Sequence, residues 1–211
     1  IPLRLVGSEM CIRDSPTTAE HVLQDLDGRI DIVVDGGATT VGVESTVLDL
    51  TESPAVILRP GAIGLEAIRT VLPDVCVRQV VASGETAVVS PGVLARHYSP
   101  RTPLVLFDGR REDALAALAT ACARAATEER SAVLLVFDGD ADALRVPGTP
   151  IVSLGNEHNA AHVAARLYGA LRDCDRLGRD VILCRAPAPD ASHPLWTAIA
   201  DRLRRAAATE G

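Results

Sequence analysis

The chain has 211 residues, of which 47% are hydrophobic, and a formal net charge of −7. This content is sufficient for one large or two small folded domains, and no apolar run approaches the roughly 20 residues that a membrane-spanning helix needs. The acidic balance disfavours a broad nucleic-acid-binding surface, although a local arginine patch is compatible with it.

Two residue types restrict the class of protein further. All basic side chains of the Lys and Arg kind are arginines, so the chain has no lysine ammonium group. The five cysteines are scattered without a C-x-x-C pair. We therefore expect a reducing compartment and no disulfide framework, with most cysteines as small core residues.

Residues 1–15 resemble the conceptual translation of a sequencing-library adapter, and we expect them to lie outside the fold. A short amphipathic strand is the structural alternative. From Pro16 onward the pattern predicts a helix, which Thr17 or Thr18 caps and which Asp27-Gly28 ends.

Short apolar runs follow that helix and predict a small sheet. The expected strands cover 30–34, 47–50, 55–58 and 75–81. A helix is expected over 64–71, with Pro73 ending it.

A polar, glycine-rich loop separates the first two of these strands. Its hydroxyls can bind carboxylate or phosphate oxygens, and its glycines allow close backbone approach; the hydroxyls belong to Thr39, Thr40, Ser45 and Thr46. The run 55–58 ends in Arg59-Pro60-Gly61, which indicates a guanidinium at the carboxyl edge of a buried strand, a good place for an anion. A hairpin with an exposed arginine is the alternative.

The segment 90–103 is rich in proline, follows a polar break over 83–89, and is interpreted as an interdomain connector. His97 and Tyr98 lie between its prolines and can donate hydrogen bonds across a neighbouring site. Plain packing of the connector is the alternative.

The remaining residues alternate strands with helices. Strands are expected over 104–107, 133–137, 151–154 and 181–184, and helices over 112–126, 159–177 and 195–207. This order predicts a parallel α/β layer with right-handed connections. No G-x-G-x-x-G follows any of these strands, so the dinucleotide-binding fingerprint is absent.

Three further features of this half have competing interpretations. Asp108 and Asp138 follow strands in repeated Phe-Asp-Gly triplets, which favour turns over a carboxylate pair. His158 and His162 have the spacing of zinc ligands but no third ligand at useful spacing, which favours a surface pair at a helix start. Trp196 is expected to pack the last helix onto the sheet.

Several motifs in order resemble the YrdC-like domain of threonylcarbamoyl-AMP synthases. They are Ser15-Pro16-Thr17-Thr18-Ala19-Glu20, Val34-Asp35-Gly36-Gly37, Gly42-Val43-Glu44-Ser45-Thr46-Val47 and Ile57-Leu58-Arg59-Pro60-Gly61. The later Ser90-Pro91-Gly92 and Arg96-His97-Tyr98-Ser99-Pro100 resemble the linker of the two-domain members.

The resemblance implies an α/β chain in three parts after residues 1–15. Residues 16–88 would be the C-terminal half of a YrdC-like twisted mixed-sheet domain, 89–103 the linker, and 104–211 a small Rossmann-like parallel α/β domain.

The same resemblance implies an enzyme, a nucleotidyltransferase. It would join L-threonine, bicarbonate and ATP into threonylcarbamoyl-adenylate, with release of pyrophosphate, for threonylcarbamoyladenosine formation in tRNA. Arg59 matches the family's nucleotide-binding arginine, Ser15 a serine near the nucleotide, and Ser45 the serine that contacts threonine. His97 and Tyr98 match linker residues that close over the site, and no catalytic residue is assigned.

The resemblance also implies Mg²⁺ bound with the nucleotide, without a protein metal site, and a cytoplasmic location. Expected partners are the tRNA-modification machinery or double-stranded RNA, in transient contact, and no membrane.

The chain departs from the family pattern in several places. The family's Lys-x-Arg nucleotide motif and its Ser-x-Asn segment have no counterpart here, and Val93 replaces a methionine often found in the linker. We therefore expect the chain alone to be inactive and the parent protein to be the synthase.

Two other functions stay open. A non-catalytic RNA-binding or partner-binding module of this fold would need an arginine-rich concave face and salt-sensitive affinity. A carbamoyl-transfer accessory domain is disfavoured by the linker and second domain.

Overall fold

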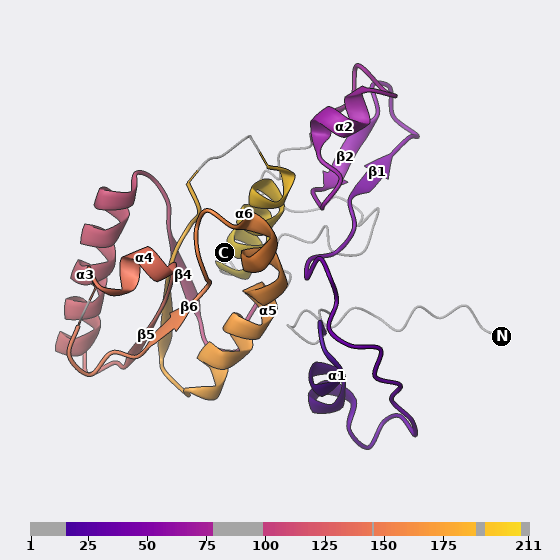
Figure 1. Ribbon diagram of the computed structural model, residues 1–211. Helices are drawn as coiled ribbons and strands as arrows, with labels where there is room; N and C mark the ends of the chain where they lie inside the picture. Colours follow the sequence, from indigo (N-terminus) through magenta and orange to yellow (C-terminus); the bar gives the residue numbers. More distant parts are fainter. Residues whose placement is uncertain (1–15, 78–98, 145, 189–192, 208–211) are drawn as a thin grey trace.

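The computed structural model describes residues 16–77, 99–144, 146–188 and 193–207. Residues 1–15, including Ser15, therefore lie outside the described residues, as do His97, Tyr98 and most of the predicted linker. The described part contains two separate sheets, in the orders β1-β2-β3 and β4-β7-β5-β6 (Figure 1). It contains no helix that is long and apolar enough to cross a membrane.

The first helix, α1, spans Ala19–Leu26 and has the predicted boundaries. The Thr18 side chain accepts a hydrogen bond from the His21 backbone N–H at 3.2 Å and so caps the helix. Asp27 is the C-terminal cap. Both ends follow from local signals that the sequence already carries.

The predicted strand over 30–34 is wrong. This stretch has no regular structure, and the side chains of Ile32 and Val34 are 80% and 88% exposed. Apolar and β-branched residues form a strand only where a neighbouring strand pairs with them and buries one face. Within the described residues these positions have no such partner.

The small sheet consists of β1 (Val47–Asp49), β2 (Val56–Arg59) and β3 (Cys76–Val77), with α2 (Leu65–Arg69) between the last two. β1 runs antiparallel to β2, and β2 parallel to β3. The middle strand is the buried one, because the side chains of Val56, Ile57 and Leu58, which alternate between its two faces, are all buried. β1 and α2 are shorter than predicted, β2 has the predicted length but begins one residue later, and residues 78–81 of the strand expected over 75–81 lie outside the described residues.

The second sheet is fully parallel, as the alternating pattern predicted. Its strands are β4 (Leu104–Phe107), β7 (Val181–Arg185), β5 (Ala132–Val136) and β6 (Ile151–Ser153). The helix α3 (Arg111–Thr127) covers one face, and α5 (Ala160–Arg176) and α6 (Pro194–Ala207) cover the other (Figure 1). The central strands β5 and β7 are buried over their whole length, which is typical of a sheet with helices on both faces.

Trp196 and the triplet at Asp138 test two expectations about the parallel layer. Trp196 is buried on α6 and meets Phe137 edge-on, with ring centroids 6.1 Å apart, so it packs the last helix onto the sheet as predicted. The triplet at Asp138 does not form a simple turn, because the short helix α4 (Asp138–Ala141) begins there. No local pattern indicates α4, since its inward residue is a carboxylate, Asp140, whose partners are arginines far along the chain.

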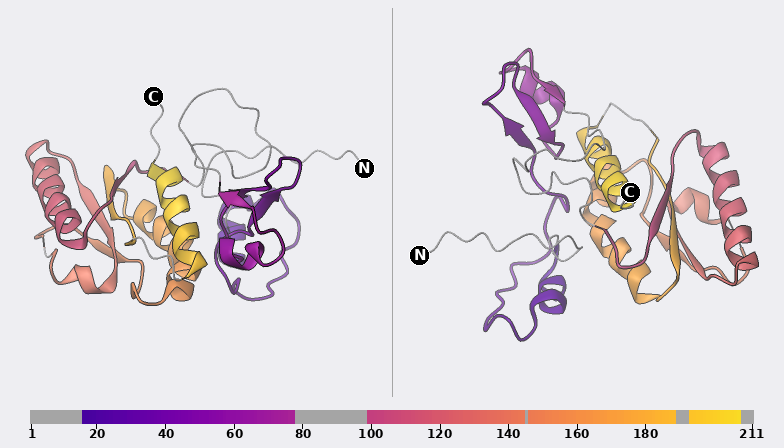
Figure 2. Two further views of the ribbon diagram at one scale, coloured as in Figure 1. Left: turned by 90° about the horizontal axis from the view of Figure 1, so that it is seen from above. Right: turned by 180° about the vertical axis from the view of Figure 1, so that it is seen from behind.

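The amino-terminal elements lie against the outer side of α5 and α6 rather than against the parallel sheet (Figure 2). Gly42 makes the closest approach. A Cβ atom placed there would lie 2.2 Å from the Ala165 Cα, and its φ of +79° is one that favours glycine. The glycine-rich loop therefore packs directly on the backbone of α5. The fold as a whole is the expected α/β class, with a small mixed sheet joined to a Rossmann-like parallel layer.

Candidate functional site

Ser45 and Arg59, the two predicted ligand-binding residues within the described ranges, lie at the same edge of the small sheet. The β1–β2 register pairs Val47 with Arg59, and the Arg59 Nε donates a hydrogen bond to the Ser45 carbonyl oxygen at 3.1 Å. The serine and the guanidinium are therefore neighbours in space although they are 14 residues apart.

Gly61 allows the two segments to continue side by side beyond that pair. A Cβ atom at Gly61 would lie 2.3 Å from the Thr46 backbone nitrogen and 2.8 Å from the Glu44 carbonyl oxygen. No other residue fits there without moving a backbone. The close backbone approach thus explains the glycine of the Arg59-Pro60-Gly61 motif, in addition to the anion binding expected of Arg59.

The predicted loop hydroxyls do not all gather at this edge. Thr46 donates its proton to the Ile63 carbonyl oxygen at 2.7 Å, so this proton is not offered to a ligand. Thr39 and Thr40 instead line an open cavity of about 430 Å³, together with Pro16, Thr17 and Tyr168. Glu44 lines the same cavity and precedes Ser45 directly, so the cavity and the Ser45–Arg59 edge adjoin each other.

His21 contacts Thr17, one of the residues that line this cavity. Its Nδ1 accepts a hydrogen bond from the Thr17 backbone N–H at 3.2 Å, so the ring is neutral with its proton on Nε2. Burial lowers the pKa of His21 below its ordinary value, and the charges of Arg172 and Arg176 lower it further. The ring is therefore a structural acceptor rather than a cation.

Glu44 has a place at this edge that its sequence motif did not indicate. Its carboxylate accepts hydrogen bonds from the Tyr168 hydroxyl at 2.9 and 3.0 Å and from the Arg202 Nε at 3.1 Å. These partners lie on α5 and α6, 124 and 158 residues away. Such distant partners leave no local pattern, so no spacing rule could have found them.

Arg202 contacts the other segment of the edge as well. Its Nη1 donates to the Pro60 carbonyl oxygen at 2.6 Å, and its side chain is fully buried. One guanidinium on α6 therefore touches both Glu44, which precedes Ser45, and Pro60, which follows Arg59.

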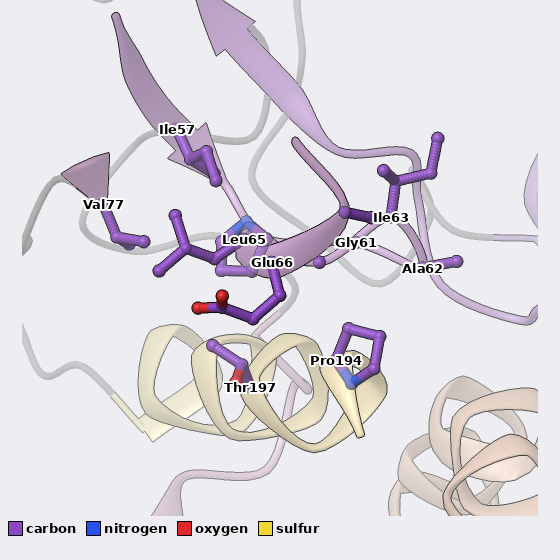
Figure 3. Close-up of a pocket in the computed structure, with 12 residues that line it drawn as sticks. Ile57, Gly61, Ala62, Ile63, Leu65, Glu66, Val77, Pro194 and Thr197 are labelled. Carbon is purple, nitrogen blue, oxygen red and sulfur yellow. The ribbon is translucent and has the colours of Figure 1, made fainter. Parts of the chain in front are cut away.

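A second cavity of about 360 Å³ lies between the small sheet and α6 (Figure 3). Its walls are mainly apolar and include Ile57, Leu65 and Val77. Figure 3 shows the Glu66 side chain pointing toward α6, near Thr197. The cavity also borders Pro60 and Gly61, so it adjoins the same edge from the opposite side.

The other predicted candidates lie away from this edge. Asp108 pairs with Arg204 at 3.2 Å, and Asp138 accepts a hydrogen bond from the Ser153 hydroxyl, so the two aspartates do not face one another. His162 lies in the first turn of α5, with its ring against Gly155. Across the ranges that the structure describes, no group of three or more His, Cys, Asp or Glu side chains is placed to hold a metal ion.

Comparisons with protein-family models match both halves of the chain. The model described as "Threonylcarbamoyl-AMP synthase, C-terminal domain" matches residues 63–208, and the model described as "Telomere recombination" matches residues 8–61.

Relatives from distant organisms agree with the family models. Threonylcarbamoyl-AMP synthase of Pyrococcus abyssi is 35% identical over 207 residues, which are 97% of this chain and 57% of that protein. The Bacillus subtilis protein of the same name is 35% identical over an alignment 213 residues long, which covers 98% of this chain and 57% of that protein. The chain thus spans a little more than half the length of the relatives that it matches.

The fold matches as well. The crystal structure of Pyrococcus abyssi Sua5 complexed with L-threonine superposes with a TM-score of 0.78 and 33% sequence identity, covering 91% of this chain and 54% of that one. The motifs at Ser45 and Arg59, the two-sheet architecture and these matches all point the same way. The chain belongs to the threonylcarbamoyl-AMP synthase family.

Proposed function

We propose that the parent protein of this chain synthesises threonylcarbamoyl-AMP from L-threonine, bicarbonate and ATP, releasing pyrophosphate, for threonylcarbamoyladenosine formation in tRNA. The observation that carries the proposal is the Arg59–Ser45 contact at one edge of the small sheet, in a chain whose relatives bear the name of this synthase. The structure of a relative complexed with L-threonine adds support for threonine as substrate.

The reaction has two steps, which together determine what the site must bind. The threonine amine first combines with bicarbonate to give a carbamate, with loss of water. A carbamate oxygen then attacks the α-phosphorus of ATP, and pyrophosphate leaves. The site must hold an anionic amino acid beside a polyphosphate, which needs fixed positive charge and directed hydrogen-bond donors.

The residues at the edge suit these roles. The Arg59 guanidinium is half-buried, and its planar fork matches phosphate oxygens, so we assign it to ATP. The Ser45 hydroxyl is assigned to the threonine substrate. Ser15 is assigned to the nucleotide and His97 and Tyr98 to closure over the site; all three assignments lie outside the described residues and stay proposals.

Further parts of the proposal concern cofactor, partners and organisation. Mg²⁺ would arrive with the nucleotide. The partners would be the tRNA-modification machinery or double-stranded RNA, in the cytoplasm where that modification would take place. The division into 16–88, 89–103 and 104–211 is supported by the separation of the two sheets.

The test is ligand binding by calorimetry, with variants at each position. We expect the chain to bind L-threonine, Ser45→Ala to weaken threonine binding, and Arg59→Met to weaken ATP binding while leaving threonine affinity close to wild type. Matched controls are Thr70→Ala and Arg69→Met on and beside α2, where both side chains are exposed and bond within their own helix.

The outcomes separate the assignments. No L-threonine binding by the wild-type chain would overturn the proposal, and equal losses from site and control variants would overturn the residue roles. Pyrophosphate release that depends on threonine should be measured in parallel. Because the chain has no lysine and no Lys-x-Arg motif, we expect none from these residues alone.

A further inference from the structure

Arg202 has no role in the proposed reaction, yet it contacts both segments that carry the proposed ligand-binding residues. It lies on α6 in the C-terminal layer, and its side chain is completely buried. A buried guanidinium is costly unless its donors meet acceptors. Here two of those acceptors come from the amino-terminal half of the chain, the Glu44 carboxylate at 3.1 Å and the Pro60 carbonyl oxygen at 2.6 Å.

These two acceptors are not arbitrary positions on the small sheet. Glu44 is joined to Ser45 by one peptide bond, and Pro60 is joined to Arg59 by another. A trans peptide holds neighbouring Cα atoms about 3.8 Å apart, although each residue keeps two soft dihedral angles. Holding the Glu44 carboxylate and the Pro60 carbonyl group with one rigid guanidinium therefore restrains the spacing between the Ser45 and Arg59 backbones.

Other contacts on the same side make this attachment tight. Tyr168 on α5 donates its hydroxyl proton to the same Glu44 carboxylate. Gly42, two residues before Glu44, packs on the backbone of Ala165. Asp201 on α6 lies 3.1 Å from the Arg202 Nη1 and so helps to orient the guanidinium. The loop is thus held by a set of directed contacts rather than by general apolar packing.

We propose that Arg202 is a positioning residue for the threonine and nucleotide site, through which the docked C-terminal layer sets the distance between Ser45 and Arg59. The inference rests on the proposed function, because it concerns the ligands of that site. Its consequence is that the affinities for threonine and ATP depend on a side chain that touches neither ligand. A misplacement of about 1 Å in an active site can lower a reaction rate by about 100-fold, even when the mutation lies far from the reacting atoms.

The experiment compares variants on one helix. Arg202→Met removes the guanidinium and keeps an apolar side chain of similar length, and Arg202→Lys keeps the charge but not the fork. Arg204→Met is the matched control, because Arg204 lies on α6 as well but is exposed and pairs with Asp108 of its own layer. Calorimetry gives the stoichiometry and dissociation constants for L-threonine and for ATP, each with and without the other ligand. Thermal melting reports whether each variant is folded.

A positioning role and a purely structural role give different results. We expect Arg202→Met to weaken the binding of both ligands by about tenfold or more and to change the dependence of the threonine affinity on ATP, at unchanged stoichiometry. Arg202→Lys should recover part of the loss, and Arg204→Met should bind like wild type. If Arg202→Met is not folded, Tyr168→Phe tests the same contact at Glu44, with a smaller loss expected.

Two results would overturn the inference. The first is a folded Arg202→Met variant that binds L-threonine and ATP with wild-type affinities and wild-type coupling between the two ligands. If Arg202→Met does not fold, the same result in Tyr168→Phe counts instead. Either result would refute the positioning role while leaving the proposed function intact. A fall in stoichiometry at unchanged dissociation constants would also refute it, since this is the sign of a smaller folded fraction. Absence of threonine binding by the wild-type chain would instead refute the proposed function, and the inference with it.

Discussion

Asp25 of α1 and Arg172 of α5 form an ion pair with two parallel hydrogen bonds, of 2.9 and 2.6 Å. Both side chains are only 9% exposed. The two residues are 147 positions apart in the sequence. This pair ties the first helix of the chain to the parallel layer, just as Arg202 ties the small sheet to it.

We expect Asp25→Ala to lower the free energy of unfolding by about 3–5 kcal/mol, because it leaves a buried guanidinium without its carboxylate. Urea denaturation followed by circular dichroism measures the change. The control is Glu20→Ala, which removes a partner of Arg176 at 3.6 Å on the exposed side of the same helix and should cost less than about 1 kcal/mol. Equal losses from the two variants would show that the buried pair has no special weight.

The close approach of the glycine-rich loop to α5 gives a second prediction. Gly42→Ala should destabilise the protein by about 2–4 kcal/mol, since the new Cβ meets the α5 backbone and the residue also keeps a left-handed φ. Gly36→Ala in the same loop is the control, because its Cβ would enter open space, and we expect it within about 0.5 kcal/mol of wild type. A Gly42→Ala variant as stable as Gly36→Ala would mean that the loop does not pack on α5.

The sequence predicted those parts of the fold whose signals are local. The cap at Thr18 and the alternation of strands and helices after Leu104 need only neighbouring residues, and both are confirmed. The strand expected at 30–34 failed because strand formation depends on a pairing partner. The helix at Asp138 was missed because a buried carboxylate is stable only beside arginines that are distant in the sequence.

The candidate site divides in the same way. Ser45 and Arg59 were found because each lies in a short motif of recognisable order. Glu44 was not, although it lies beside Ser45, since its importance comes from Tyr168 and Arg202 on helices that fold onto it. The residues proposed to bind ligands directly left a sequence signal, whereas those proposed to hold them in place did not.

The buried ring of His21 predicts a dependence of stability on pH. Burial, then Arg172 and Arg176, lower its pKa in the folded state below the ordinary value of 6.5, so in mildly acidic solution the unfolded chain binds more protons at this site than the folded one. The contribution of His21 is therefore complete above pH 6.5 and is lost as the pH falls below that value toward the lowered pKa. Protonation of Nδ1 would also break its hydrogen bond from the Thr17 N–H.

His21→Gln isolates this effect, because glutamine does not titrate and its side-chain oxygen can accept a hydrogen bond. We expect the free energy of unfolding of wild type to fall more steeply than that of His21→Gln between pH 7 and 5 in urea titrations. Parallel curves for the two proteins would contradict the buried neutral imidazole.

The cysteines differ in reactivity for the same physical reason. Cys76 is exposed on β3, whereas Cys122, Cys174 and Cys184 are buried. Burial raises the pKa of Cys174 to about 12 and raises that of Cys184 as well, so their reactive thiolate forms are scarce at neutral pH. A thiol reagent should therefore modify Cys76 rapidly in the native protein, and Cys76→Ser should lose one rapid equivalent. The three buried thiols should react only as fast as the protein unfolds, and rapid native modification of all three would contradict their burial.

The last prediction concerns the carboxyl edge of the parallel sheet, where Asp140 of α4 lies between two guanidinium groups. Its Oδ2 is 2.5 Å from the Nε of Arg185, and its Oδ1 is 2.7 Å from the Nε of Arg111. Asp140 and Arg185 have almost no exposed surface, and the Arg185 guanidinium also lies over the Phe137 ring at 4.6 Å. Burying such a pair carries a high desolvation cost. Removing one partner should therefore lower the free energy of unfolding more than replacing both partners with apolar residues does.

We therefore expect Asp140→Leu to cost about 3–5 kcal/mol in the free energy of unfolding, because it takes the buried carboxylate away from Arg185 and leaves that guanidinium with Glu157, whose side chain is partly exposed. Arg185→Met alone should cost less, since the remaining carboxylate keeps Arg111, which is partly exposed. The double variant should be more stable than Asp140→Leu, because removing both charges removes the desolvation cost together with the attraction. Urea denaturation of all four proteins gives the coupling energy as a double-mutant cycle. Additive losses would mean that the two side chains contribute independently, and that Asp140 is held by Arg111 alone.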